Sequence, residues 1–353
     1  MHLFTSTSDM RRNLTGFVAG VLSALLLLEL VLRFLPVSTA TLNGRYLDPM
    51  LLTYPPGHRW VSSTGWDLRN AQHLQANNFG FVAGVDFVKD SSALAFIGDS
   101  MIEASMLNAE QRPAAQLAAA LAPRPVYALP GPGSSLLDYA ERIRWAHENL
   151  DSQDFIVFLE RGDLIQAVCG SGQVHGSCFN KSSGKIDTEI GAEPNFLKRL
   201  FRHSATAQYF MGQLKLSPQR LLKQAVAQTH PEGAPVGASS LSPSAELSAE
   251  EKAVAKLFFE RVKPHVHGRL LLVMDGDRAS MYQGHSTVHP RVEFLTQMAR
   301  DHGAGFIALD EAFALNYRER GLSFDVGPYD AHLNPDGVRV AMNAIARAWN
   351  ERP

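Results

Sequence analysis

The chain has 353 residues and 45% of them are hydrophobic, which is enough for one large core or two modest ones. The formal net charge at pH 7 is −2, so composition excludes the basic surface that nucleic-acid binding requires. No phosphate-binding loop, zinc-protease motif or dinucleotide fingerprint occurs, so we predict no cofactor and no metal.

Residues 14–35 are apolar except for Glu29 and Arg33, which lie four apart near the end of the run. The run is long enough to span a bilayer and longer than the core of a usual signal peptide. We predict an uncleaved transmembrane anchor. A cleaved signal sequence is the alternative, because small residues at Ser38-Thr39-Ala40 offer a cleavage site.

Arg11 and Arg12 precede this run, which favours an N-terminus on the cytoplasmic side. Residues 1–13 are then cytoplasmic. We expect a single-pass protein of the inner or plasma membrane, with the bulk of the chain in the periplasm or outside the cell. The membrane is thus one expected partner, and the sequence predicts no particular protein partner.

Residues 36–92 contain turn-forming and aromatic residues without strong periodicity, and we interpret them as a linker that wraps over one edge of a sheet. The main domain is predicted over residues 93–353. Its five short apolar runs, each followed by polar residues or a turn, are 93–97, 126–129, 155–159, 270–274 and 306–309.

Helical patterns at 109–121 and 136–150 separate the first three of these runs. Alternation of this kind predicts an α/β fold: a doubly wound, flavodoxin-like parallel sheet of about five strands with flanking helices. Ligands bind beyond the carboxyl ends of the strands in such sheets, and the polar clusters of this chain follow those ends.

Residues 164–268 are too many for one crossover connection. Within them, residues 196–227 have a helical, basic and amphipathic pattern, and Ser248 with Glu251 has the spacing of a capping box. We expect an inserted helical lid over the active edge of the sheet.

Cys169 and Cys178 are the only cysteines, and they lie nine residues apart. This spacing suits a small loop closed by a disulfide, which an extracytoplasmic location permits. His175 within the loop raises the alternative of a metal site, but the spacing fits no standard zinc pattern, so we favour the disulfide.

Ser100 follows the first apolar run at Gly98-Asp99-Ser100, where a helix is expected to begin. A serine there presents its hydroxyl at the edge of the sheet, and its backbone N–H is one of the free donors of the helix start. These properties suit a nucleophile with an adjacent oxyanion donor. Alternatively, Asp99 and Ser100 only cap the helix.

Near the C-terminus, Asp330 and His332 precede a second predicted helix. A histidine is able to accept the proton of an attacking serine, and an aspartate holds the imidazole in the required tautomer. The alternative is a structural histidine beside the helix-opening residues Asn334 and Pro335.

Taken together, the Gly-Asp-Ser block and the late Asp-x-His block resemble the SGNH (GDSL-type) esterase and acyltransferase superfamily. The turn at 77–81 resembles that of its membrane-anchored members, so the resemblance covers about residues 77–350. It implies ester chemistry through an acyl-serine intermediate, with Ser100, His332 and Asp330 as catalytic residues. The family usually has Asp-x-x-His, but Tyr329 stands at that position here, so Asp325 is kept as a reserve.

The resemblance also implies an oxyanion hole made by the Ser100 N–H and a glycine N–H of the second block, Gly133 or else Gly131, with Gly162 of the third block as a further candidate. The third block of the family ends in Asn-Asp, whereas this chain has Gly162 and Asp163 there. The side-chain amide is therefore missing, and loss of one such donor costs about 2.7–4 kcal/mol of transition-state stabilisation. Arg161 is a candidate electrostatic substitute.

We expect Asp99, Arg161, Asp163 and Asp275 to contact substrate. Because the chain is predicted outside the cytoplasm, the expected substrates are acyl esters, chiefly O-acetyl esters, of cell-envelope glycans, cleaved by hydrolysis or transferred. The alternatives are an inactive domain that binds glycan or protein, and a lipid esterase or thioesterase.

Overall fold

The computed structural model describes residues 7–172, 176–190, 196–214, 216, 246–285, 289–327 and 330–351. The chain forms two compact units. One comprises Met1–Thr41, Trp60–His73 and Glu193–Gly233, and is called the anchor unit below. The other comprises Leu42–Arg59, Leu74–Ala192 and Ala234–Pro353, and is called the sheet unit.

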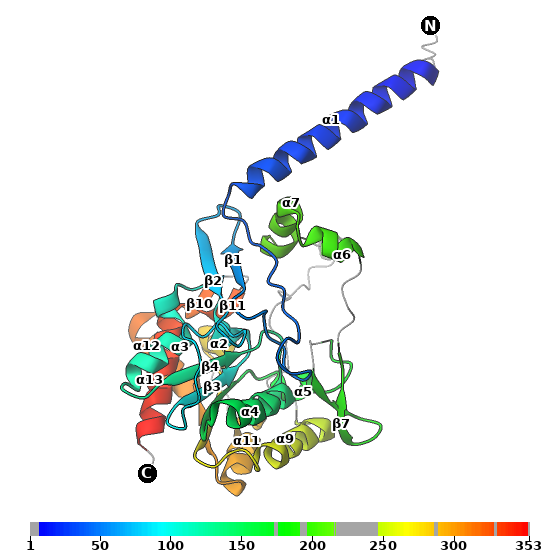
Figure 1. Cartoon of the computed structure of the whole chain (residues 1–353). Helices are drawn as coiled ribbons and strands as arrows, with labels where there is room; N and C mark the ends of the chain where they lie inside the picture. Colours follow the sequence, from blue (N-terminus) through cyan, green and yellow to red (C-terminus); the bar gives the residue numbers. More distant parts are fainter. Residues whose placement is uncertain are drawn as a thin grey trace. The chain divides into compact units, whose positions relative to one another are not determined.

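The sheet unit contains a five-stranded parallel sheet, in the order β4-β3-β5-β8-β9 (Figure 1). This order confirms the predicted doubly wound, flavodoxin-like arrangement. The strands are β3 (Leu94–Gly98), β4 (Val126–Pro130), β5 (Asp154–Leu159), β8 (Leu270–Met274) and β9 (Gly305–Ala308). Each lies within one residue of its predicted apolar run, because strands buried on both faces are apolar throughout.

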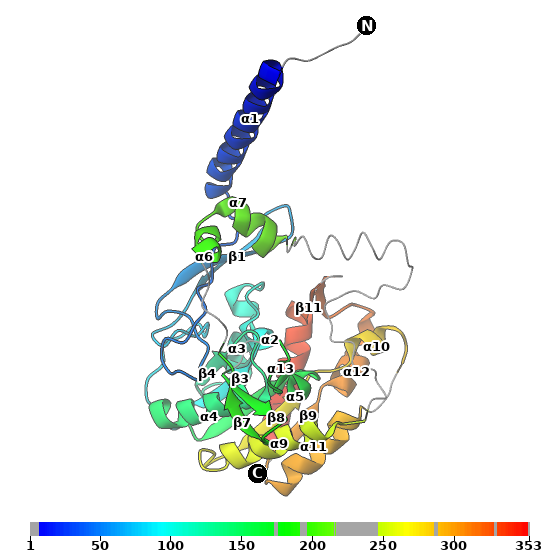
Figure 2. The same cartoon turned by 90° about the vertical axis from the view of Figure 1, so that its right-hand side faces the viewer.

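Helices cover both faces of this sheet (Figures 1 and 2). One layer holds α4 (Leu136–Leu150), α9 (Ala249–Val262) and α11 (Pro290–Asp301); the other holds α3 (Pro113–Ala120), α12 (Asp310–Arg320) and α13 (Pro335–Asn350). In α13 the buried residues Val338, Ala341, Ile345 and Trp349 recur at helical spacing and form the face that packs on the core.

Two local predictions about these helices have clear outcomes. The helix predicted over 109–121 is interrupted: a 3-10 turn η1 (Ala109–Gln111) precedes α3, which begins at Pro113. Proline has no N–H and is therefore placed at a helix start. The predicted capping box is confirmed, since the Ser248 and Glu251 side chains each accept the other's backbone N–H at the start of α9.

The anchor unit contains the long helix α1 (Thr7–Arg33) and three short helices, α6 (Phe196–Phe201), α7 (Ala205–Ala207) and the π-helix η2 (Gln208–Gln213). Most of a two-stranded sheet, β1 (Arg59–Thr64) with β2 (Asn70–Gln75), also belongs to it. Residues Asn13–Arg33 of α1 are the one stretch of the described chain long and apolar enough to cross a membrane, properties that a signal sequence shares.

The insert predicted over 164–268 is divided between the two units. The hairpin β6 (Ser177–Asn180) and β7 (Lys185–Thr188) and the helix α9 belong to the sheet unit, whereas α6, α7 and η2 belong to the anchor unit. The helical pattern predicted over 196–227 is found in part, as the short helices at 196–201 and 205–213, and residues 215 and 217–227 lie outside the described chain. That any part of the insert acts as a lid remains a prediction.

Candidate active site

Ser100 lies at the sharp turn between β3 and the short helix α2 (Ser100–Glu103). The turn requires glycine at Gly98, because a Cβ there would lie 2.4 Å from Cγ1 of Ile102. Asp99 caps the helix, and its Oδ1 accepts the Met101 N–H at 2.8 Å. Ser100 is partly exposed at the carboxyl end of the sheet, as expected for this type of turn.

The residues Asp330 and His332 reach Ser100 from a small hairpin, β10 (Asp325–Gly327) with β11 (Asp330–Leu333). Nε2 of His332 lies 2.9 Å from Oγ of Ser100, and Nδ1 of His332 lies 2.6 Å from Oδ1 of Asp330. This arrangement fits the tautomer with a proton on Nδ1, which leaves Nε2 free to accept the Ser100 proton. The structure thus brings these three predicted residues together, with His332 between Ser100 and Asp330.

Arg278 holds this hairpin, and no sequence motif pointed to it. Its Nε donates to Asp325 Oδ1 at 2.8 Å and its Nη1 to Asp275 Oδ1 at 2.6 Å. Nη2 donates to the carbonyl oxygen of Ala331, the residue between Asp330 and His332. Asp325, the reserve for the third catalytic residue, is therefore paired with Arg278. The only sequence signal was the polar run 275–278 after the fourth apolar strand.

Three of the acids expected to contact substrate, Asp99, Asp163 and Asp275, are buried, which corrects that expectation. Asp163 Oδ2 accepts the Glu160 N–H at 2.9 Å and the Tyr139 hydroxyl at 3.1 Å. Asp275 pairs with Arg278 as described. These side chains are directed into the protein, where they support the loops that follow β3, β5 and β8.

This buried cluster favours protonated carboxyl groups. Burial raises the pKa of Asp99 to about 6 and that of Asp163 well above its usual value. The Asp99 carboxylate, together with burial, raises the pKa of Glu160 to about 8. Burial also raises the pKa of Asp275, although the Arg278 guanidinium opposes this effect.

Arg161 also differs from its expected role. Its Nη2 donates to Oδ1 of Asp310 at 2.5 Å, and its Nη1 lies 4.0 Å from Oδ2 of Asp277. Only 16% of its side chain is exposed. Arg161 is thus committed to joining the loop after β5 to the start of α12, and does not replace the missing asparagine amide.

The expected oxyanion donors have different environments. The Gly131 N–H donates to the Gly98 carbonyl at 2.9 Å, and a Cβ at Gly131 would lie 1.7 Å from Nη2 of Arg142. Because its N–H is already used in this hydrogen bond, Gly131 is not the oxyanion donor that the sequence analysis offered as an alternative to Gly133. Among the described residues, the N–H groups of Ser100, Gly133 and Gly162 have no acceptor. They follow β3, β4 and β5, which are neighbours in the sheet, so three backbone donors remain at this edge.

Glu103 is a buried acid that the sequence analysis missed. It lies three residues after Ser100 in α2, and its Oε2 accepts the Tyr54 hydroxyl at 2.7 Å. Burial raises the pKa of Glu103 to about 7, whereas the hydrogen bond from Tyr54 and the nearby His332 lower it. Its ionisation is therefore coupled to the charge of the candidate base.

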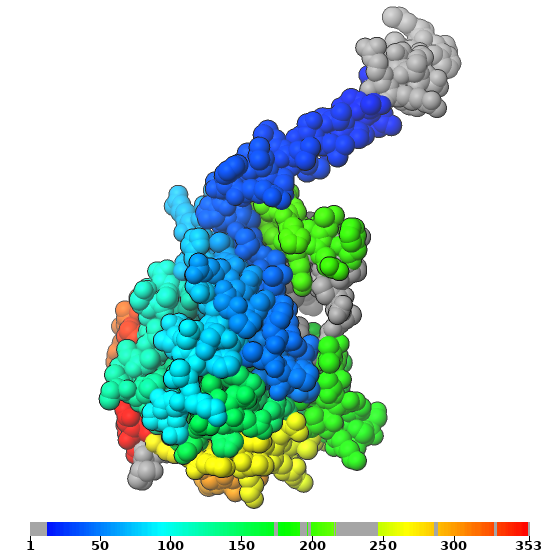
Figure 3. Space-filling view, viewed as in Figure 1, coloured from blue at the N-terminus to red at the C-terminus, as the bar shows by residue number. Residues whose placement is uncertain are grey.

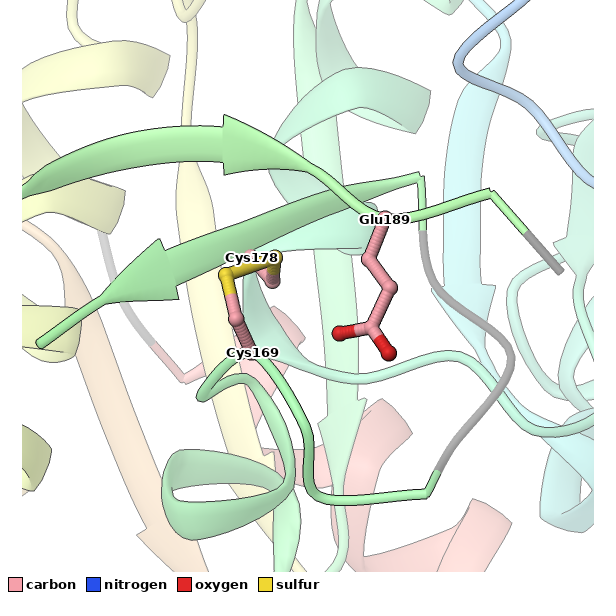
Figure 4. A group of neighbouring side chains, drawn as sticks. All are labelled: Cys169, Cys178 and Glu189. Atoms are coloured by element: carbon pink, nitrogen blue, oxygen red, sulfur yellow. A yellow bond between two sulfur atoms is a disulfide. The ribbon is translucent and has the colours of Figure 1, made fainter.

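The predicted disulfide between Cys169 and Cys178 is confirmed, and Figure 4 shows it beside Glu189. The three side chains lie close enough for a metal site, but both sulfur atoms are used in the disulfide. Glu189 Oε2 accepts the Gly170 N–H at 2.7 Å and so closes the same loop. His175, the other residue of the metal alternative, lies outside the described chain.

No family model matches the chain, and no curated protein matches it. A solved structure of a member of the lipolytic protein G-D-S-L family from Veillonella parvula is 12% identical, with a TM-score of 0.40, over 74% of this chain and 99% of that one. A two-domain esterase active on acetylated mannans is 9% identical, with a TM-score of 0.38, over 73% of this chain and 49% of that one.

A third structure is LAE5, an alpha/beta hydrolase enzyme from the metagenome of Lake Arreo, Spain. It is 15% identical, with a TM-score of 0.39, over 74% of this chain and 97% of that one. Similarities of this size carry no conclusion about chemistry, which follows here from the contacts of Ser100, His332 and Asp330 themselves.

Proposed function

We propose that this chain is an SGNH-type serine esterase. The observation that carries the proposal is the contact series from Ser100 Oγ through the His332 imidazole to the Asp330 carboxylate. Ser100 comes from the start of the main domain, and Asp330 and His332 come from its end. A histidine with a purely structural role would not need both a serine at a strand-to-helix turn and a carboxylate as its neighbours.

In the proposed reaction, His332 Nε2 takes the Ser100 proton while Oγ attacks the ester carbonyl carbon. Asp330 stabilises the resulting imidazolium, and the N–H groups of Ser100, Gly133 and Gly162 are the candidate donors to the oxyanion. His332 then protonates the leaving alcohol. An acceptor hydroxyl attacks the acyl-serine by the same route in reverse, so water gives hydrolysis and a sugar hydroxyl gives transfer.

The proposed substrates are O-acetyl esters of cell-envelope glycans. Two observations support this choice. Helix α1 is suited to anchor the chain in the inner or plasma membrane, with the sheet unit in the periplasm or outside the cell. The Cys169–Cys178 disulfide fits an oxidising compartment.

The missing asparagine at Gly162 favours a second candidate, an inactive domain of the same fold that binds glycan or a protein partner. A fluorophosphonate probe separates the two functions on the full-length protein in detergent. We expect labelling at Ser100 and none in Ser100→Ala, whereas the exposed control Ser92→Ala labels normally. A folded protein that does not react would favour the binding domain.

A series of aryl esters of increasing acyl length defines the substrate class. We expect acetyl esters to be preferred, with kcat/KM reduced at least about 10³-fold in Ser100→Ala. A preference for long acyl chains would contradict glycan deacetylation as the proposed function and would favour hydrolysis of lipid esters or thioesters.

A further inference from the structure

The short helix α7 lies against the last turns of α1 (Figures 1 and 2). The Glu29 carboxylate accepts hydrogen bonds from Ser204 Oγ and from the N–H groups of Ala205 and Thr206, each at 2.9 Å. Arg33 Nη2 donates to the carbonyl oxygen of His203 at 3.2 Å. Glu29 therefore caps the start of α7, although this helix is far from Glu29 in the sequence.

The position of Glu29 in α1 determines the depth of this contact in a membrane. A hydrocarbon core of about 30 Å needs roughly 20 helical residues, and the apolar span Asn13–Arg33 has 21. Glu29 lies about one turn before the end of that span. A backbone hydrogen-bonded to Glu29 consequently lies at the boundary between acyl chains and headgroups whenever α1 spans a bilayer.

The segment from α6 to η2 exposes large apolar side chains. Phe196, Leu200 and Met211 are 76%, 55% and 56% exposed, and Phe201 and Phe210 are also exposed. In α6, Phe196, Leu200 and Phe201 lie within an arc of about 140°, and Arg199 lies on the opposite arc. Arg202 is the first residue after the helix. Exposed apolar surface of this kind marks an interaction site, and the basic side chains complement phosphate groups.

We propose that residues 196–213 form a membrane-surface element that lies in the headgroup region beside α1, in contact with anionic phospholipid. Phe196, Leu200 and Phe201 enter the acyl boundary, while Arg199 and Arg202 face lipid phosphates. Figure 3 shows the surface of this segment in green beside the end of α1. The inference rests on the proposed anchor and is independent of the ester chemistry.

The test uses the full chain in nanodiscs of phosphatidylethanolamine and phosphatidylglycerol, with a nitroxide label at Leu200→Cys. Both native cysteines are in the disulfide, so the introduced thiol is the one that reacts. We expect collisions with oxygen to dominate over collisions with a water-soluble nickel chelate. Leu322→Cys, which is 50% exposed in the sheet unit, is the matched control and should favour the nickel chelate.

A label at Leu22→Cys, within α1, separates failure of this inference from failure of the anchor. If the label at position 22 is accessible to oxygen but the label at position 200 is accessible to the nickel chelate, the anchor stands and the membrane-surface element is wrong. A nickel-accessible label at position 22 would overturn the anchor and with it the inference.

Two further comparisons define the lipid partner. Replacing both Arg199 and Arg202 with Gln should lower the oxygen-to-nickel ratio at position 200 in the anionic discs, with little change at position 22. If protection at position 200 appears only in discs that hold two copies of the chain, the surface is a contact between copies and the proposed lipid contact is wrong.

Discussion

At the scale of single residues, Glu103 is a buried acid three residues after Ser100 and near His332. Glu103 is the last residue of α2 and is buried, and its charged form loses hydration that the Tyr54 hydrogen bond replaces only in part. A raised carboxyl pKa means that the folded protein holds a proton that the unfolded chain releases. Ionisation of Glu103 therefore opposes folding as the pH rises.

Glu103→Gln tests this effect, because an amide keeps the shape of the side chain without the titration. Below pH about 4.5, the carboxyl is protonated in both states and contributes no pH dependence. Between that value and a folded pKa of about 7, the wild type loses stability relative to the variant, by up to roughly 3 kcal/mol. Denaturant unfolding at pH 5 and pH 8 measures the difference.

The exposed residue Glu110 provides the matched control, and Glu110→Gln should track the wild type at both pH values. Parallel stability profiles for the wild type and Glu103→Gln would contradict the assignment of a raised pKa to Glu103.

At the scale of elements, the hairpin of β10 and β11 is positioned by one guanidinium. Arg278 joins the end of β8, through Asp275, to Asp325 in β10 and to the Ala331 carbonyl in β11. It does not contact the reacting atoms and is therefore a positioning residue. Arg278 is therefore one of the contacts that fix the hairpin, beside the hydrogen bonds from Asn334 Nδ2 to the Asp325 carbonyl and from the Phe324 N–H to the Tyr282 hydroxyl.

Arg278→Met should lower kcat by about 10–100-fold while leaving KM almost unchanged, because a small displacement of His332 impairs proton transfer more than binding. The same change leaves Asp275 without its partner and should destabilise the protein by about 3–5 kcal/mol. Kinetics normalised to the folded fraction separate the two effects. Arg320→Ala, at an exposed ion pair with Asp336, is the control and should alter neither quantity.

An unchanged kcat in the folded fraction of Arg278→Met would limit Arg278 to a structural role. Arg278→Lys refines the result, since a single ammonium group keeps the charge but is unable to bridge all three acceptors.

At the scale of the whole molecule, the chain consists of an anchor unit and a sheet unit, with the long insert contributing to both. The contacts of Glu29 with α7 lie wholly within the anchor unit. An insert that follows the third strand of the sheet thus returns to the N-terminal helix. This connection favours an α1 that is retained in the mature protein.

The mass of the protein extracted from membranes decides between an anchor and a cleaved signal. We expect a product that retains residues 1–40, because cleavage after them would remove the helix that α7 contacts. A product lacking residues 1–40 would contradict both the anchor and the membrane-surface element. Resistance of the full chain to alkaline carbonate extraction is the accompanying measurement.

Local patterns in the amino-acid sequence were sufficient to predict the sheet, the strand-to-helix turn at Ser100, the Asp-x-His block, the capping box and the disulfide. Each of these depends on local pattern: continuous apolar runs, a glycine at a tight turn, or a short spacing between partners. The five strands and the Cys169–Cys178 disulfide were found for this reason.

By contrast, the environment of each polar group near Ser100 depends on how the chain packs in three dimensions. Asp99, Asp163 and Asp275 follow strands as a substrate-binding acid would, yet all three are buried and hydrogen-bonded inside the protein. Arg278 and Glu103 have no sequence signature, because their importance arises from groups brought together by packing of distant segments. The division of the insert between two units has the same origin: the acceptor for the start of α7 is Glu29, about 175 residues away, and no local pattern reports such a contact.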